Sequence, residues 1–290
     1  MADPAASDRL RAALARGPLV LDAAMGTRLI ARGLDLSTDD PALWNLSSPE
    51  TVRELHERDV AAGSDAVVTN TFGANRHWLE RFGRAEDVAA INRRAVELAR
   101  EAAGPGRFIL GSIGPTASGF PDSAREQAEA LAGSGVDALL FETHRLEVAE
   151  RALEQVGETV ALPLFVCLIN WPPSPAEPAR RLAGLGATAL GANCQLGMEP
   201  ALRLAEALHR ATDLPLIFKP GAGLPGESPA SPESFARAVS ELEELGARLI
   251  GGCCGTTEAH VAAIRSACPP WNSVGGSTAA GHNVPRGQSP

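Results

Sequence analysis

The feature that most constrains the fold of this chain is a set of eight short apolar runs, each followed by a segment with helical periodicity. The runs span residues 18–22, 66–70, 107–111, 138–142, 164–168, 187–191, 216–219 and 248–251. They are almost wholly apolar rather than alternating, which indicates parallel strands buried on both faces beneath helices. Eight strand–helix units predict an α/β chain folded as a (β/α)8 TIM-type barrel, whereas six would favour an open doubly wound sheet.

Start signals support this division into elements. Ser48-Pro49 and Ser231-Pro232 each place an N-capping residue before a proline at the first helical position. Residues 170–175 hold three prolines and are predicted to form a loop after the fifth strand. We expect one barrel over residues 1–268. A tail at 269–290, rich in Gly, Ser, Pro and Asn, is expected to be disordered.

Charge and cysteine content restrict the partners and the compartment. The chain has 26 basic and 35 acidic residues, a net charge of −9, which argues against binding to nucleic acid or to an anionic membrane. No stretch has the pattern of a secretory signal or a membrane span, so we expect a cytoplasmic protein. Five cysteines, an odd number, fit a reducing compartment, where clustered thiols suggest metal binding or catalysis.

Polar side chains and thiols follow the apolar runs. In a barrel of this class the catalytic groups lie at the carboxyl ends of the strands. The corresponding segments are 22–27, 69–73, 142–144, 192–194 and 251–255. We therefore expect residues that are far apart in the sequence to meet on one rim.

The cysteines at these ends carry the most specific signal. Cys253 and Cys254 are adjacent, flanked by Gly252 and Gly255, and Cys194 ends the sixth strand. Adjacent cysteines rarely form a disulfide because the ring is strained, and the flanking glycines permit unusual backbone angles. Three thiolates suit a tetrahedral Zn²⁺ site with one open position, which is typical of catalytic zinc.

The other two cysteines are interpreted differently. Cys167 lies within an apolar run and Cys268 lies near the tail, so both are expected to be small buried apolar side chains. The chain has no Cys-x-x-Cys pair, which disfavours a redox centre.

The two cysteine motifs resemble the zinc-binding signature of the homocysteine S-methyltransferases. The motifs are Gly191–Cys194 and Gly251–Gly255, and the resemblance extends from about Leu19 to Ile264. Weaker matches are Met25–Thr27, Ala62–Asp65, Thr69–Arg76, Gly111–Pro115, Phe141–Thr143 and Ala222–Pro225. Within the family the chain looks most like the homocysteine-binding module of cobalamin-dependent methionine synthases.

This resemblance implies an activity. Zinc would lower the pKa of the homocysteine thiol, the sulfur would attack a methyl group in line, and the thioether methionine would leave as a poorer ligand. The sequence has no cobalamin-binding or folate-binding module, so the methyl donor would arrive in trans, on a corrinoid protein for example. Two alternatives stay open: another small thiol as acceptor, or a non-catalytic zinc-braced partner of a corrinoid protein.

The resemblance also implies roles for residues of the rim. Asp22 and Glu142 would receive the substrate ammonium, and backbone N–H groups of Ala23, Ala24 and Met25 would receive its carboxylate. Without the resemblance, Asp22 is interpreted as a helix or turn cap, and Glu142 as forming a salt bridge on the rim with an arginine such as Arg145. Asn70 would orient either the site or its loop, and Asn193 would brace the turn before Cys194. His144 and His260 are predicted to be core or surface histidines rather than ligands. The family usually has Asp-Gly where this chain has Asp22-Ala23, which places a methyl group where the backbone should approach the substrate.

Overall fold

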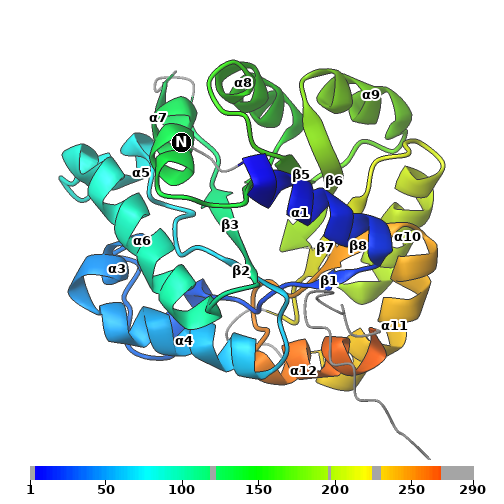
Figure 1. Ribbon diagram of the computed structural model, residues 1–290, viewed down its shortest axis with the longest axis horizontal. Coiled ribbons are helices and arrows are strands. Elements are labelled where there is room, and N and C mark those ends of the chain that lie inside the picture. The colour runs from blue at the N-terminus through cyan, green and yellow to red at the C-terminus, as the bar shows by residue number, and fades with distance from the viewer. Residues whose placement is uncertain (1–3, 118–121, 195–196, 224–229, 269–290) are drawn as a thin grey trace, which may run out of the picture.

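The computed structural model describes residues 4–117, 122–194, 197–223 and 230–268. Eight parallel strands form one sheet in the order β1-β8-β7-β6-β5-β4-β3-β2. They are β1 (Leu19–Val20), β2 (Ala66–Val68), β3 (Phe108–Ile113), β4 (Ala138–His144), β5 (Leu164–Leu168), β6 (Ala187–Cys194), β7 (Leu216–Pro220) and β8 (Ala247–Ile250). Every predicted strand is present, and the expected (β/α)8 barrel is confirmed (Figure 1).

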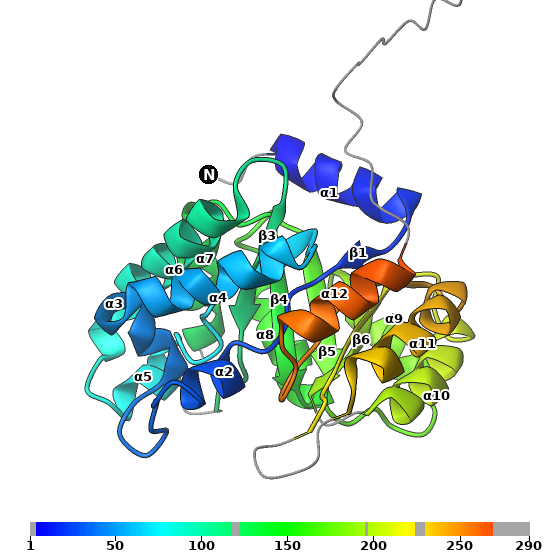
Figure 2. The same ribbon diagram turned by 90° about the horizontal axis from the view of Figure 1, so that it is seen from below.

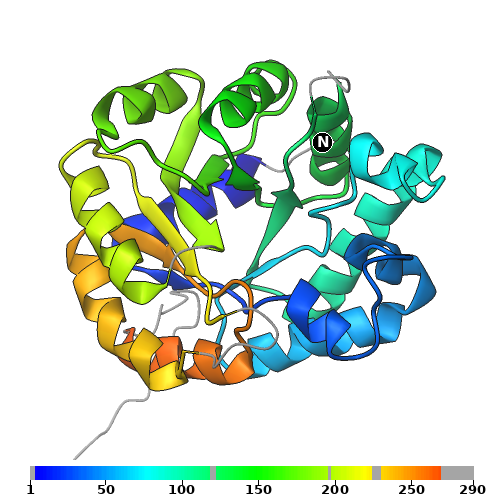
Figure 3. The same ribbon diagram turned by 180° about the vertical axis from the view of Figure 1, so that it is seen from behind.

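Helices surround the strands on all sides (Figure 3). They are α1 (Pro4–Arg16), α2 (Gly26–Ile30), α3 (Trp44–Ser47), α4 (Pro49–Ala61), α5 (Arg76–Glu80), α6 (Val88–Ala103), α7 (Ser123–Gly133), α8 (Leu146–Gly157), α9 (Ala176–Gly184), α10 (Met198–His209), α11 (Pro232–Glu244) and α12 (Glu258–Ala267), with short 3-10 turns η1 (Pro41–Leu43) and η2 (Ala85–Asp87). Helices α4 and α11 begin at the predicted prolines. The predicted loop at 170–175 is also confirmed, because α9 begins only at Ala176.

The core has two layers, one inside the barrel and one between the strands and the helices. Inside, Phe108 and Phe165 pack with leucines of the strands and with Leu10 and Leu14 of α1. Helix α1 lies across the end of the barrel at which the strands begin (Figure 2). Helix α1 thus covers that end, and the polar residues at the strand ends lie at the opposite rim.

The barrel has a seam between its first two strands. None of the strand ladders of the described residues joins β1 to β2. Instead the Asp65 N–H donates to the Val20 carbonyl (2.7 Å), and the Val20 N–H donates to Asp65 Oδ2 (2.9 Å). At the rim end of the seam the Val68 N–H donates to Asp22 Oδ2 (2.7 Å). One backbone hydrogen bond and two carboxylates therefore join β1 to β2 where a strand ladder is missing.

Within the ranges given above, no helix is long and apolar enough to cross a membrane. The predicted tail at 269–290 lies outside the described residues.

Candidate metal centre

The structure brings the three predicted cysteine ligands together at the rim. Cys194 is the last residue of β6, and Cys253 and Cys254 lie in the turn between β8 and α12. Their sulfur atoms all lie within 4.8 Å of one another, and Cys194 Sγ is 3.4 Å from Cys254 Sγ. Three thiolates on one tetrahedral zinc, at about 2.3 Å each, would be separated by about 3.8 Å. The sulfur cluster therefore fits a metal ion of that size.

The sulfur atoms also interact directly. Hydrogen bonds from the Cys194 and Cys253 thiols lower the pKa of Cys254. One thiolate is thus stabilised by its neighbours even before a metal ion binds, which favours capture of a cation that prefers soft ligands.

Unusual backbone angles aim these side chains. Cys194 has φ 67°, and Thr143 at the end of β4 has φ 61°, both in the left-handed region that non-glycine residues rarely adopt. Asn193 holds the two strand ends together: its Oδ1 accepts from the Thr143 N–H (2.8 Å) and its Nδ2 donates to Thr143 Oγ1 (2.9 Å). The same Nδ2 lies 3.8 Å from Cys253 Sγ. Asn193 does brace the turn, as predicted, but it also contacts the Cys253 sulfur.

The two glycines beside the cysteine pair serve different purposes. Gly255 has φ 78°, as the sequence predicted. Gly252 has no positive φ; a Cβ there would lie 2.3 Å from Thr256 Oγ1. The prediction of a special dihedral was therefore right for Gly255 only, and Gly252 is needed for the close approach of Thr256.

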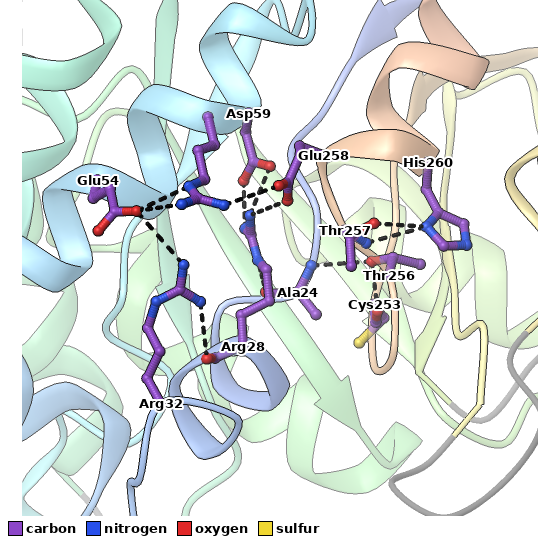
Figure 4. Close-up of polar contacts among 11 residues, drawn as sticks. Ala24, Arg28, Arg32, Glu54, Asp59, Cys253, Thr256, Thr257, Glu258 and His260 are labelled. Atoms are coloured by element: carbon purple, nitrogen blue, oxygen red, sulfur yellow. Dashed lines mark hydrogen bonds and ion pairs between the residues drawn. The ribbon is translucent and has the colours of Figure 1, made fainter.

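Figure 4 shows how the cysteine turn is attached to the rest of the rim. The buried Thr256 hydroxyl donates to the Cys253 carbonyl (2.7 Å) and accepts from the Ala24 N–H (3.0 Å). Ala24 is held in turn, because its carbonyl accepts from Arg28 Nε (2.6 Å), and the Arg28 guanidinium forms a buried two-point ion pair with Asp59. The turn after β8 is thus connected through the β1 loop to helix α4.

A cavity of about 280 Å³ opens beside the cysteines. All six residues predicted to contact the substrate line it, namely Asp22, Ala23, Ala24, Met25, Asn70 and Glu142. Its wall also includes Thr69, Phe72, Ser112, Thr143 and Lys219. A small molecule in this cavity would meet sulfur at one side and buried charges at another.

The charged part of the cavity consists of Asp22, Glu142 and Lys219, each less than a tenth exposed. Lys219 Nζ lies 3.0 Å from Glu142 Oε2 and 3.8 Å from Asp22 Oδ1. Burial raises the pKa of Asp22 to about 7, against the opposing effect of Lys219. Burial alone would lower the pKa of Lys219, but the carboxylates of Glu142 and Asp22 raise it, so the lysine is protonated.

Lys219 was not among the residues that the sequence predicted for the site. Only its position in the sequence could have identified it. Lys219 is a lysine near the end of an otherwise apolar strand, and the other strands place polar groups at the same rim. The partner proposed for Glu142 on sequence grounds, Arg145, lies outside the cavity lining, and Lys219 takes that place.

The backbone donors predicted for a carboxylate are partly engaged. The Ala24 N–H donates to Thr256 Oγ1 (3.0 Å). Asn70 Nδ2 donates to the Pro41 carbonyl (2.6 Å), so Asn70 fixes a loop while it lines the cavity. The Ala24 bond links the cavity wall to the turn after β8, and the Asn70 bond joins two residues that both line the cavity.

The remaining cysteines and histidines follow the apolar or structural interpretation. Cys167 and Cys268 are buried and free. His144 Nδ1 contacts the Glu142 carbonyl (2.8 Å), and burial lowers the pKa of His144 to about 4. His260 forms the capping box of α12 with Thr257 and reaches the Ala230 carbonyl. Neither histidine belongs to the sulfur cluster.

Comparisons with known proteins agree with this geometry. The family described as Homocysteine S-methyltransferase matches residues 19–268. Methionine synthase of Mycobacterium tuberculosis is 30% identical over 303 residues, covering 88% of this chain and 25% of that protein. Methionine synthase of Mycobacterium leprae is 29% identical over 325 residues, covering 95% and 26%. The chain therefore spans about a quarter of the length of these relatives.

Solved structures give the same result. The metallated form of the homocysteine methyltransferase MmuM from Escherichia coli has a TM-score of 0.76 and 29% identity, with 89% of this chain and 99% of that chain covered. A methyltransferase from Methanosarcina mazei has a TM-score of 0.62 at 15% identity and shows the shared fold alone. The sulfur cluster, the cavity beside it and the family match over residues 19–268 lead to one conclusion. The chain belongs to the homocysteine S-methyltransferase family.

Proposed function

We propose that this chain transfers a methyl group to the thiol of homocysteine, giving methionine, at a Zn²⁺ ion held by Cys194, Cys253 and Cys254. The observation that carries the proposal is the three-sulfur cluster opening onto a cavity that also holds Asp22 and Glu142. Zinc in this cluster would supply the Lewis acidity that lowers the pKa of an incoming thiol. The proposal assigns this activity to a single barrel over residues 1–268, and the segment 269–290 lies outside the described residues.

The chain's own residues bind and orient the acceptor. Asp22 Oδ1 is buried and has no hydrogen-bond partner, so it is placed to accept from an ammonium group. Met25, at the start of the short helix α2, offers its backbone to the substrate carboxylate, while the neighbouring Ala24 N–H is held by Thr256. The methyl groups of Ala23 and Ala24 narrow the cavity on this side. Together these groups would fix the amino-acid end and leave the thiol pointing toward the sulfur cluster.

An open ligand position favours an enzyme over a zinc-braced scaffold. Among the residues that the structure describes, only three side chains of the metal-binding types gather at this point. Catalytic zinc sites keep one position for water or substrate, whereas structural sites are closed by a fourth protein ligand. The cavity beside the cluster gives a thiol access to such a position.

The methyl donor is proposed to come from a separate corrinoid protein. This part of the proposal is supported by the relatives named methionine synthase, of whose length this chain spans about a quarter. Three reduced thiols are required at the site, which favours a reducing compartment such as the cytoplasm. Free methylcobalamin is the simplest probe of this donor class.

The test of the acceptor is a calorimetric titration of L-homocysteine into zinc-loaded, reduced protein in buffers of different ionisation enthalpy. We expect about one equivalent to bind, with release of a proton from the thiol. Cys254→Ser should abolish binding, whereas Cys268→Ser, a buried cysteine outside the cluster, should not. Protein that retains one zinc per chain but binds no homocysteine would refute the assignment and direct the search to other small thiols.

A further inference from the structure

The cavity contains a permanent cation of its own. Lys219 is only 5% exposed, and its ammonium donates to Glu142 Oε2 at 3.0 Å. A buried lysine keeps its charge only where anions compensate the loss of water, and here two carboxylates do so. One of the two carboxylates that the family resemblance assigns to the substrate ammonium is therefore already occupied by a side chain.

The hydrogen bonds of the two carboxylates show which oxygen remains free. Glu142 Oε1 accepts from Ser112 Oγ (2.7 Å) and Oε2 accepts from Lys219, so both oxygens have donors. Asp22 Oδ2 accepts from the Val68 N–H (2.7 Å). Asp22 Oδ1 is buried, lacks a hydrogen-bond partner and lies 3.8 Å from Lys219 Nζ, beyond hydrogen-bonding distance.

We propose that Lys219 is a specificity-determining residue: by pairing with Glu142 it leaves Asp22 Oδ1 as the single atom that binds the ammonium of the acceptor thiol. This inference rests on the proposed function, because it concerns how the same cavity selects its acceptor. Glu142 then acts as the partner of Lys219 and does not contact the substrate.

The charges explain the selection. The positive charge of Lys219 and the negative charge of Glu142 cancel. The Asp22 carboxylate then leaves one uncompensated negative charge in a site of low dielectric constant. A thiol that carries an ammonium group compensates that charge. A thiol acid without an amino group brings a second negative charge instead, and like charges in such a site repel strongly. The cavity should therefore discriminate between amino-thiols and simple mercapto acids.

The probes are L-homocysteine and 4-mercaptobutanoate, which is the same molecule without its amino group. Binding of each to zinc-loaded protein is measured by calorimetry, and the ratio of the two dissociation constants reports ammonium recognition independently of thiol binding. Wild type should prefer homocysteine by about tenfold or more, the equivalent of one good charged contact.

Two variants separate a direct role of Glu142 from an indirect one. In Glu142→Gln the lysine loses its partner and turns to Asp22, so the preference for homocysteine should fall about tenfold. Adding Lys219→Met removes the competing cation and frees Asp22 again. The double variant should therefore prefer homocysteine to 4-mercaptobutanoate more strongly than the Glu142→Gln single variant does. Residues in contact do not act additively, so recovery of stability alone is not informative; a merely structural repair would restore binding of both thiols together and leave the ratio of the two dissociation constants unchanged.

The outcomes are distinct. A double variant with no more preference than Glu142→Gln, or a Glu142→Gln variant that keeps the full preference, would overturn the proposal. Unfolding curves and zinc content of each variant show whether it folds. If Glu142→Gln does not fold, Asp22→Asn must abolish the preference, and retention of it would overturn the proposal equally. Wild type that binds neither thiol would refute the proposed function itself.

Discussion

Removal of one hydroxyl should loosen the whole cysteine turn. Thr256 is fully buried, and its Oγ1 links the Ala24 N–H (3.0 Å) to the Cys253 carbonyl (2.7 Å). Thr256→Val keeps the shape of the side chain and removes both bonds. The Ala24 N–H then becomes a buried donor without an acceptor, which costs about 1–3 kcal/mol. The Cys253 carbonyl still accepts from the Thr256 N–H at 3.0 Å, so losing the hydroxyl donor costs less free energy at this carbonyl.

These contributions sum to about 2–4 kcal/mol of unfolding free energy, taking the net hydrogen bond to the Cys253 carbonyl at about 1 kcal/mol at most. Thr256→Ser is the matched control, because it keeps the hydroxyl and deletes one methyl group, worth about 1 kcal/mol. Urea unfolding of the metal-free protein measures both variants. Since the turn carries Cys253 and Cys254, zinc affinity should also fall about 10- to 100-fold in Thr256→Val, as seen when outer partners of metal ligands are removed.

Competition with a chromogenic chelator measures the zinc affinity of the same variants. A Thr256→Val protein within about 0.5 kcal/mol of Thr256→Ser, with unchanged zinc affinity, would refute the reasoning, because that difference is no more than an ordinary surface substitution gives.

Three further predictions follow from groups near the rim and beneath it. Asn193→Ala should shift the sulfur-to-metal charge-transfer band of the cobalt(II)-loaded protein, because the Asn193 amide lies 3.8 Å from Cys253 Sγ; an unmoved band would show that the amide does not act on the sulfur. Burial raises the pKa of Asp22 to about 7, so protonation of Asp22 below that pH should weaken its binding to the substrate ammonium. Homocysteine affinity measured from pH 8 to 6 should therefore fall more steeply in wild type than in Asp22→Asn. Equal slopes in the two proteins would contradict this role of Asp22. Burial lowers the pKa of His56 from 6.5 to about 3. Below pH 6.5 the unfolded chain therefore takes up a proton at His56 that the folded chain does not. The free energy of unfolding should then fall by about 1.4 kcal/mol for each pH unit down to pH 3. Urea unfolding at pH 7 and about pH 5.5 should show a smaller loss in His56→Gln, and an identical loss would exclude His56 as the cause.

The barrel could be predicted from the sequence because each strand carries its own signal. Runs such as 138–142 are apolar on both faces, which only a covered parallel strand requires, and the helix starts at Pro49 and Pro232 are local. The cysteine cluster could be predicted for a related reason. Once the strands are assigned, the barrel rule places the end of β6 and the turn after β8 on one rim.

The features that were missed all depend on contacts between distant segments. No local sequence pattern predicts the left-handed backbone at Thr143. That conformation is held by a hydrogen bond to Asn193 at the end of β6. The pairing of Lys219 with Glu142 joins strands β7 and β4, 77 residues apart in sequence. Charge pairing of this kind depends on side-chain reach across the barrel interior, which strand order alone does not define.

The seam between β1 and β2 makes closure of the barrel responsive to what the cavity holds. Asp22 bonds the Val68 amide with one oxygen and presents the other to the cavity. A cation bound there keeps the carboxylate ionised and in place, so the Val68 amide proton should exchange with deuterium more slowly when the cavity is filled. The Val20 amide, which Asp65 holds at the far end of the same seam, supplies an internal reference. Occupancy of the cavity could thus be followed by deuterium exchange at individual backbone amides, without any measurement on the sulfur atoms or the metal.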